Sequence, residues 1–355
     1  MQLGLNLGYW GPGNDTASVD LAVEADRLGY SVCWAAEAYG SDAVTVLAWV
    51  GSRTQRIDLG SAVLQIPARS PAMTAMTAAT LDTLSGGRFR LGLGVSGPQV
   101  SEGWHGVRFD DPLGRTHEYV DVVRLALSRQ DLSYQGRHWQ LPLPGGEGKA
   151  IRLAARRVRD RIPIYLATVG PRNSRLAGEI ADGWLGVFFA PEHAGAALDP
   201  IREGRIAAGH GAAPGSDPMA GFDVVPTVPL VVADDVAAAA EPIRRHAALY
   251  LGGMGSRKHN FYNALARRMG FEEAAEQVQD LFLGGNPREA ARAVPLEFID
   301  ATSLIGPIER IAERMHAYAE AGVTTLSLTP HADTAQGRVE TLRAAVRAFE
   351  LSGLA

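Results

Sequence analysis

Eight short apolar runs, separated by segments with helical periodicity, are the feature that most constrains how this chain can fold. Most of the runs are continuously hydrophobic, which is typical of parallel strands covered by helices. Eight strand–helix units predict a closed (β/α)8 barrel, the α/β fold known as the TIM barrel, because an open doubly wound sheet usually has fewer strands. The predicted strands span residues 3–7, 31–35, 57–63, 89–95, 162–167, 183–188, 224–232 and 324–329.

Helices are expected between the strands, and two stretches exceed the simple repeat. Gly29 and Gly322 are typical helix stops, and Pro71 suits the first turn of a helix. We interpret residues 98–161 and 234–305 as insertions within a single domain that covers residues 1–355, and we expect a hairpin near residues 134–137. The predicted helices span residues 18–28, 71–84, 115–127, 173–181 and 307–321.

Composition argues against several classes of protein. The net charge is −5, whereas a nucleic-acid partner favours a basic face. Cys33 is the only cysteine, so an internal disulfide is impossible. The N-terminus lacks the pattern of a secretory signal, and no apolar run approaches the roughly 20 residues that a membrane span needs. We therefore expect a cytoplasmic protein with neither nucleic acid nor membrane as a partner.

The segment after the predicted strand 162–167 is a candidate anion site. Gly170 would let a ligand approach the backbone, and the N–H groups at the start of the next helix favour an anion. Arg172 adds a positive charge, and Asn173 and Ser174 can donate hydrogen bonds. An ordinary turn with a capped helix explains the same residues equally well.

A second glycine-rich segment contains the spacing G-x-G-x-x-G but does not fit the dinucleotide fingerprint. That fingerprint needs its glycines after a strand and at the start of a helix. Here Gly92 and Gly94 fall inside a predicted strand, and residues 98–106 are expected to form a loop. Glycine within a strand instead indicates a bulge or a ligand close to the backbone.

Several polar and aromatic side chains follow predicted strands, where a barrel builds its active site. Glu37 is a candidate acid, base or ligand holder, with a salt-bridged or capping glutamate as the alternative. Gln65 follows small residues that could admit a flat ring, and ordinary barrel packing explains those residues about as well. Tyr9, Trp10 and Trp104 could line an aromatic pocket, or simply pack on loops.

The sequence lacks the patterns of several other catalytic classes. The nine histidines show neither His-x-His nor His-Glu-x-x-His, so we predict no metal site. The Gly-x-Ser-x-Gly elbow of serine hydrolases is absent. Neither Lys149 nor Lys258 ends a predicted strand, which argues against a Schiff-base enzyme.

Taken together, these segments resemble the bacterial luciferase-like superfamily, and in particular its actinobacterial F420-dependent oxidoreductases. The resemblance extends over nearly the whole chain, and it implies a barrel with insertions that is commonly dimeric, so a homodimer is expected. The segments that carry it are residues 34–37, 60–67, 84–89, 91–97, 101–106, Arg115, Glu118 with Tyr119, 166–174, 176–184, 250–255 and 260–263.

The resemblance also implies roles for individual residues. Ala62 and Val63 occupy the position of a non-proline cis peptide that supports the coenzyme's central ring. Gln65, Ser96 and Gly97 would contact the ring or its ribityl chain, and Glu37 would lie near the ring's edge. Residues matching the family's phosphate loop are Val169, Gly170, Arg172 and Asn173.

One departure from the family pattern concerns catalysis. The sugar-phosphate dehydrogenases of the superfamily carry a histidine directly after the acidic residue, and this chain has Ala38. Glucose 6-phosphate oxidation by that mechanism is therefore not expected. Candidate proton carriers, besides Glu37, are His105, Glu102, His259 and Tyr262.

The resulting hypothesis is an oxidoreductase that transfers a hydride between coenzyme F420 and a small organic substrate. Carbon replaces the reactive flavin nitrogen in a deazaflavin, which favours hydride transfer over oxygen activation. One alternative is an FMN-dependent monooxygenase that uses reduced flavin and O2. Another alternative is a non-catalytic carrier of a flavin or deazaflavin.

Overall fold

Eight parallel strands close into a barrel in the computed structural model, which describes residues 1–8, 10, 16–156 and 158–355. Strand β12 pairs with β1 on one side and with β10 on the other, so the sheet returns to its first strand. The predicted (β/α)8 barrel is confirmed, and each predicted apolar run overlaps one barrel strand. The strands, in their order around the barrel, are β1 (Gln2–Asn6), β2 (Val32–Ala35), β3 (Asp58–Ser61), β5 (Phe89–Gly94), β8 (Ile164–Ala167), β9 (Gly183–Val187), β10 (Asp223–Val232) and β12 (Thr325–Pro330).

Two short strands extend this sheet. The predicted run 57–63 is too long, because β3 ends at Ser61 and the Ala62–Val63 peptide bond that follows is cis. The chain then pairs only with β5, through β4 (Leu64–Gln65). Strand β11 (Leu304–Gly306) pairs with the end of β10 outside the barrel. The carboxyl ends of all eight barrel strands point to one rim, which we call the mouth.

Packing inside the barrel explains the glycines within its strands. Trp34 fills the interior and meets Tyr165 edge to face, with ring centroids 5.2 Å apart. A Cβ atom at Gly60 would lie 2.1 Å from the Trp34 ring, and one at Gly92 would lie 1.9 Å from the carbonyl oxygen of Ser61. The expected bulge is present beside Gly92, because residues 61–63 lie opposite only residues 91–92 between the pairs Gly60–Arg90 and Leu64–Leu93. The backbone of the neighbouring segment, and not a ligand, occupies the space at Gly92.

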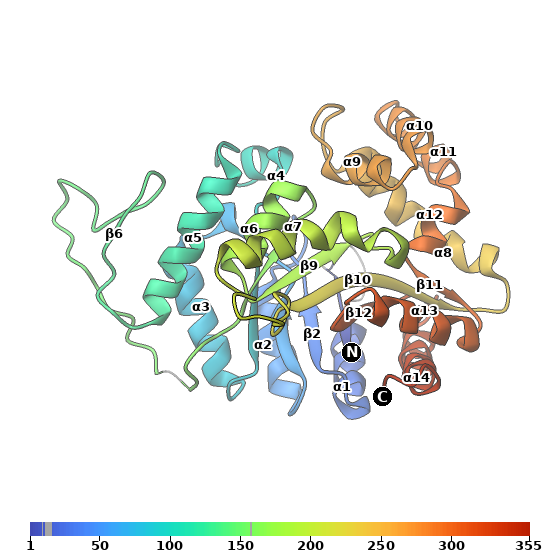
Figure 1. The fold of residues 1–355 in the computed structure, drawn as a ribbon, viewed down its shortest axis with the longest axis horizontal. Coiled ribbons are helices and arrows are strands. Elements are labelled where there is room, and N and C mark those ends of the chain that lie inside the picture. The colour runs from blue at the N-terminus through green and yellow to red at the C-terminus, as the bar shows by residue number, and fades with distance from the viewer. Residues whose placement is uncertain (9, 11–15, 157) are drawn as a thin grey trace.

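Helices cover the outside of the barrel, as Figure 1 shows. Gly29 and Gly322 follow α1 and α13 with positive φ angles, as predicted for helix stops. The predicted helix 173–181 begins two residues earlier, at Pro171. The outer helices are α1 (Thr16–Leu28), α2 (Ala43–Arg53), α3 (Pro71–Leu84), α6 (Pro171–Ile180), α7 (Ala194–Ala207), α8 (Val236–Ala248), α13 (Ile308–Glu320) and α14 (Ala335–Leu351), with short 3-10 turns η1 (Ile66–Ala68) and η2 (Pro191–His193).

The stretch 98–161 carries two helices and the predicted hairpin. Residues 98–103 form helix α4 (Pro98–Gly103), so the loop expected over residues 98–106 is wrong for its first six residues. Gly97 precedes that helix in an extended conformation, and Pro98 occupies its first turn. Helix α5 (Pro112–Leu127) follows, and β6 (Tyr134–Gln135) pairs antiparallel with β7 (Gln140–Leu141).

The stretch 234–305 is mainly helical and has a core of its own. Side chains such as Val278, Phe298 and Ile299 are fully buried there, and the cluster continues to Phe188 and Ile305 beside the barrel. Figure 1 shows these helices in yellow to orange at one end of the molecule. They are α8, a π-helical turn η3 (Leu249–Gly253), α9 (Phe261–Arg268), α10 (Glu272–Leu283), α11 (Pro287–Arg292) and α12 (Leu296–Ala301).

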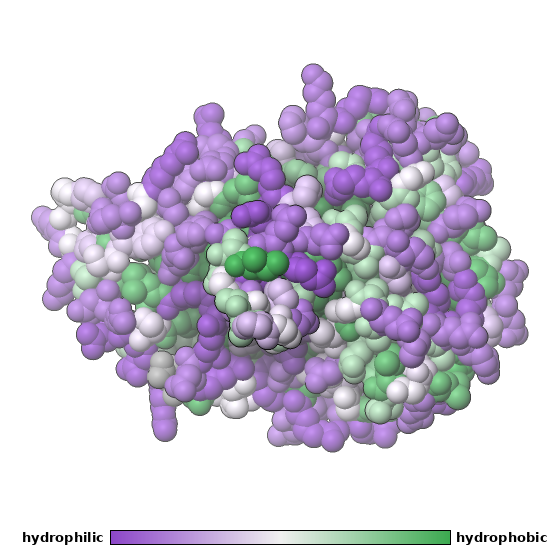
Figure 2. Space-filling model, in the orientation of Figure 1, coloured by the Kyte–Doolittle hydropathy of each residue, from purple (hydrophilic) through white to green (hydrophobic). Residues whose placement is uncertain are grey.

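The surface is mixed in character. Hydrophilic side chains predominate on the face drawn in Figure 2, and apolar ones form small groups among them. Within the described residues, none of the helices has both the length and the apolar character that a membrane crossing requires.

Candidate functional site

Glu37 lies at the mouth directly after β2, and its carboxylate is fully engaged. It accepts hydrogen bonds from the backbone N–H groups of Ala43 at 3.1 Å and Gln65 at 3.0 Å. It also forms a two-pronged ion pair with Arg69, in which Nη2 donates to Oε2 at 3.0 Å and Nη1 donates to Oε1. Only 5% of the Glu37 side chain is exposed. The carboxylate therefore ties β2, β4 and the segment after η1 together.

Gln65 extends this network to the end of β5. Its amide nitrogen donates to the carbonyl of Ala38 at 2.9 Å, and its amide oxygen accepts from the hydroxyl of Ser96 at 2.9 Å. Ser96 has a φ angle of 62°, which is uncommon for a residue with a side chain. Glu37, Gln65 and Ser96 thus form one hydrogen-bonded chain, which we call the polar rail.

The polar rail brings together most residues predicted to contact a ring. The cis bond between Ala62 and Val63 is present as expected, and both side chains pack on the interior cluster around Trp34. Gly97 follows Ser96 as the N-cap of α4. The sequence missed Arg69, which neutralises the buried end of the rail.

The predicted phosphate loop lies at the end of β8. Gly170 is the N-cap of the ten-residue helix α6 and carries no side-chain cap, and Pro171 follows it. The N–H groups of Arg172 and Asn173, in the first turn, have no acceptor within the helix. A Cβ atom added at Gly170 would meet nothing within 4 Å. The loop therefore presents open backbone donors, as an anion site requires.

Two hydrogen bonds hold Thr168 at the start of the phosphate loop, and a third reaches the loop from α9 in the stretch 234–305. The indole N–H of Trp184 donates to the carbonyl of Thr168 at 3.0 Å. The hydroxyls of Thr168 and Ser174 lie 3.0 Å apart. From α9, the guanidinium of Arg268 donates to the carbonyl of Val169 at 3.0 Å. Arg172 and Arg268 consequently flank the loop from two different parts of the chain.

The four further proton-carrier candidates lie in two separate places. Glu102 and His105 belong to α4 and the turn after it, where Glu102 accepts a hydrogen bond from the Phe109 N–H at 3.0 Å. The Nε2 atom of His105 is buried and has no hydrogen-bond partner among the described residues. His259 lies in the turn before α9, with Nδ1 3.4 Å from the hydroxyl of Ser256.

Tyr262, the fourth candidate, belongs to an aromatic group that the sequence did not reveal. Its ring centroid lies 4.7 Å from that of Tyr250 and 6.3 Å from that of Phe188. His246 completes the group, 4.5 Å from Tyr250. Desolvation raises the pKa of Tyr262 to about 12, so its hydroxyl remains protonated at neutral pH. We call Phe188, His246, Tyr250 and Tyr262 the aromatic wall.

The aromatic wall lies across the mouth from the polar rail. Phe188 directly follows β9, and His246 and Tyr250 belong to the segment after β10. In the closed strand order, β10 is four positions from β3, which leads into the cis bond and Gln65. The His246 ring has exposed area, but the surrounding protein desolvates it and, with a smaller effect of His331, lowers its pKa to about 4. The wall is therefore uncharged at neutral pH.

The aromatic pocket suggested for Tyr9, Trp10 and Trp104, with loop packing as the alternative, stays a prediction. Trp104 is 66% exposed. The backbone N–H of Trp10 donates to the hydroxyl of Ser41 at 2.9 Å. Tyr9 lies outside the described residues. The tryptophans follow different strands, and the turn after α4 points Trp104 to solvent.

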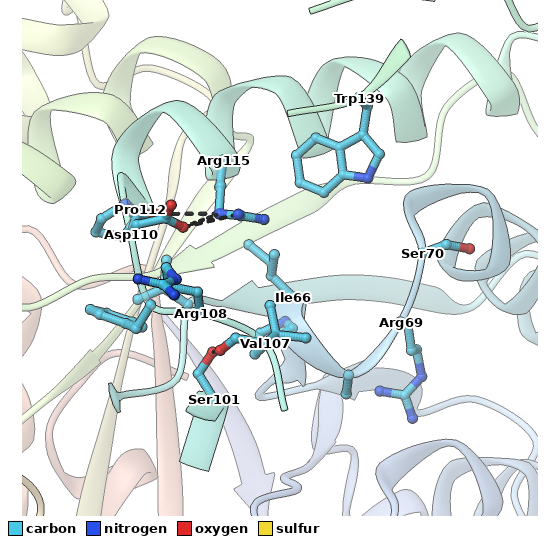
Figure 3. Close-up of a pocket in the computed structure, with 14 residues that line it drawn as sticks. Ile66, Arg69, Ser70, Ser101, Val107, Arg108, Asp110, Pro112, Arg115 and Trp139 are labelled. Carbon is cyan, nitrogen blue, oxygen red and sulfur yellow. Dashed lines mark hydrogen bonds and ion pairs between the residues drawn. The ribbon is translucent and has the colours of Figure 1, made fainter. Parts of the chain in front are cut away.

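A cavity of ≈ 320 Å³, which we call the side cavity, lies behind the polar rail (Figure 3). Its walls come from η1, from the segment between α4 and α5, and from the hairpin. None of the predicted site residues that the structure describes lines it. The lining residues are Ile66, Pro67, Ala68, Arg69, Ser70, Val95, Ser101, Val107, Arg108, Phe109, Asp110, Pro112, Arg115 and Trp139.

Comparison with known proteins identifies the family. The model of the luciferase-like monooxygenases matches residues 12–325. The chain belongs to this family. It is 44% identical over 335 residues to Rv3520c of Mycobacterium tuberculosis, which is assigned as a coenzyme F420-dependent oxidoreductase, with 93% of this chain and 95% of that protein covered.

Solved structures of this fold include relatives with different coenzymes. The F420-dependent tetrahydromethanopterin reductase from Methanopyrus kandleri superposes with a TM-score of 0.78, at 24% identity, and the match covers 97% of both chains. A Baeyer–Villiger monooxygenase from Pseudomonas putida in complex with FMN superposes with a TM-score of 0.67, at 20% identity, covering 100% of this chain and 98% of that one. The predicted resemblance is confirmed, and the chain is an enzyme of the luciferase-like class.

Proposed function

We propose that this enzyme transfers a hydride between coenzyme F420 and a small, uncharged organic substrate. The observation that carries the proposal is the arrangement of the mouth, where the strand order places the phosphate loop between the polar rail and the aromatic wall. The similarity to the Mycobacterium tuberculosis oxidoreductase over almost the full length of both chains supports F420 as the coenzyme.

The described residues fit such a coenzyme by their donor chemistry. Free N–H groups at the start of α6, with Arg172 and Arg268 beside them, suit a phosphate group. Gln65 and Ser96 offer amide and hydroxyl groups for a polar chain or ring edge, above the surface formed by Ala62 and Val63. When bound, the deazaflavin would supply the hydride chemistry, and the protein would supply position and electrostatics.

In this proposal Glu37 positions the coenzyme and does not move the proton. Both carboxylate oxygens already accept hydrogen bonds from Ala43, Gln65 and Arg69. A general base needs a free lone pair within hydrogen-bond reach of the proton it removes. Tyr262 and His105 remain better candidates, because Tyr262 belongs to the wall that we place beside the substrate and a ring nitrogen of His105 has no partner within the described part of the chain. Glu102 and His259 rank below them, since each already has a local partner.

The uncharged substrate follows from the aromatic wall. Phe188, Tyr250 and Tyr262 offer apolar ring surfaces, and His246 is neutral at neutral pH. Apolar rings stabilise a ligand by burying its apolar surface. A phosphate or carboxylate placed against them would lose its hydration, and no cation in the described wall would compensate for that loss. Position 38 holds alanine and not the histidine of the sugar-phosphate dehydrogenases, which likewise argues against a sugar phosphate as the substrate.

Equilibrium dialysis against F420 and against FMN tests the coenzyme. We expect F420 to bind at least tenfold more tightly, and hydride transfer to appear with neutral alcohols or ketones before their phosphorylated or carboxylated counterparts. Tight FMN binding without F420 binding would overturn the proposal. The FMN-bound neighbour makes the reduced-flavin monooxygenase the second candidate, and oxygen consumption with reduced FMN would support it.

We also propose that the enzyme forms a homodimer through α2 and α3. These neighbouring helices expose Trp49 (59%), Met73 (52%), Met76 (52%) and Leu84 (74%), an unusual set of large apolar side chains for a solvent-facing surface. Sedimentation analysis should give a dimer for the native chain and a monomer for a Trp49→Glu, Met76→Glu double variant. A native monomer at micromolar concentration would refute the proposal.

A further inference from the structure

We propose that the side cavity is a second ligand site, which binds a small organic carboxylate with an apolar body. The cavity volume of ≈ 320 Å³ lies at the lower end of the range for small-molecule sites, roughly 300–1,000 Å³. Such sites combine mainly apolar walls with a few placed polar groups. The inference does not depend on the identity of the coenzyme.

The apolar walls are built from separate segments and are fixed in place. Ile66 comes from η1, Val107 from the segment after α4, and Trp139 from the hairpin. In Figure 3 the Trp139 ring and the Ile66 and Val107 side chains surround the same space. Trp139 packs edge to face on the buried Tyr119, with centroids 5.5 Å apart. These walls suit an apolar body, whose burial contributes about 25 cal/mol per Å².

The charged residues around the cavity determine which polar group the ligand can carry. Arg115 is paired with Asp110, with Nη2 and Oδ1 2.9 Å apart, and this contact lowers the pKa of Asp110. Arg69 is paired with Glu37. Arg108 forms neither a hydrogen bond nor an ion pair with any other described residue that faces this cavity. One guanidinium is therefore available, and a carboxylate is the planar anion that it binds best through paired hydrogen bonds.

The side cavity and the mouth are separated by the protein itself. Gln65 and Ser96 belong to the polar rail, whereas Ile66 and Val95, their sequence neighbours, line the cavity. The Glu37–Arg69 ion pair stands between the two spaces, because Arg69 lines the cavity and Glu37 belongs to the rail. A carboxylate in the cavity would consequently be a ligand additional to the coenzyme.

Calorimetric titration with octanoate tests the inference on the native chain, with octylammonium as the matched cation. We expect one equivalent of octanoate to bind, and octylammonium to bind at least tenfold more weakly. Arg108→Gln should weaken octanoate binding by tenfold or more. Arg288→Gln, at an exposed arginine of α11, should leave octanoate binding unchanged. The proposal would be overturned if octanoate did not bind, or if the native chain and the Arg108→Gln variant bound it equally well.

Two further measurements locate the ligand. Val107→Trp should fill the cavity and abolish octanoate binding, in a variant whose circular dichroism and unfolding midpoint match the native chain; retained binding in that folded variant would refute the site. Octanoate should also bind with the same affinity when F420 is saturating, and displacement by F420 would overturn a separate site. A chain that binds octanoate but not F420 would refute the proposed function and leave this inference standing.

Discussion

Replacing Glu37 with glutamine separates a positioning role from an acid–base role. The glutamine side chain keeps the shape but offers only one oxygen, and its NH2 group would face donors that now point at a carboxylate. The backbone N–H of Ala43 or Gln65 would lose its acceptor, and Arg69 would lose its counter-charge. The structure thus predicts damage to the rail before any effect on chemistry.

The magnitude follows from the burial of the pair. Breaking a buried ion pair by removing one partner costs about 3–5 kcal/mol. Because Arg69 retains 16% exposure and Glu37 only 5%, we expect the lower end, about 3 kcal/mol of unfolding free energy. Displacement of Gln65 and Ser96 should weaken coenzyme binding by about tenfold, or about 1.4 kcal/mol.

Three assays on Glu37→Gln decide between the roles. Urea denaturation should show the lower stability, titration the weaker coenzyme affinity, and single-turnover kinetics at saturating coenzyme a change of less than about tenfold. Glu297→Gln, at an exposed glutamate of α12, is the matched control and should alter none of these. A hundredfold loss of single-turnover rate with native stability and affinity would refute the reasoning and make Glu37 the acid or base.

Three more predictions concern the loop and the wall. Gly170→Val should lower coenzyme affinity at least tenfold by calorimetry while folding survives, because a Cβ there meets nothing within 4 Å; unchanged affinity would place the phosphate elsewhere. Arg268→Ala should weaken the coenzyme by about threefold to tenfold and reduce the salt dependence of binding, and an unaltered salt slope would contradict a role in charge neutralisation. His246 has a folded pKa of about 4, below its ordinary 6.5, so its contribution to stability is complete above pH 6.5 and is lost as the pH falls towards 4. Urea midpoints between pH 7 and 4 should therefore fall less in His246→Gln than in the native chain, and parallel curves would contradict this.

The barrel could be predicted from the sequence because its signal is local. Continuous apolar runs of strand length mark buried parallel strands wherever they occur, and eight of them leave few alternatives. Helix α4 escaped the same reasoning, since its six residues are too few to show a period and Gly97 offers no capping side chain. The need for glycine in β5 could not be worked out in detail for a related reason: the atoms that require Gly92, those of Ser61 and Leu185, come from other strands.

Site residues could be predicted from the sequence only where they lie close together in one segment of the chain. The phosphate loop and Gln65 with Ser96 stand in short recognisable stretches, whereas Arg69 and Arg268 reach their partners across 32 and 99 residues. The chain has 34 lysines and arginines, of which only two are lysines. The sequence therefore offered no reason to single out Arg69 and Arg268 among so many arginines. The aromatic wall and the side cavity are likewise assembled from several segments, and their chemistry exists only in the folded chain.

The strand order gives this assembly a functional consequence. The proposed coenzyme side of the mouth is built by β2, β3, β4, β5 and β8, which all lie in the first half of the chain, whereas the aromatic wall follows β9 and β10 and draws on residues 234–305. Arg268 is the described hydrogen-bonding link between that stretch and the phosphate loop. Substitutions in Tyr250 or Tyr262 should therefore change which substrate is accepted while coenzyme affinity stays within about twofold, a change smaller than 0.5 kcal/mol. Parallel loss of coenzyme affinity in Tyr250→Ala would show instead that the two sides of the mouth act as one surface.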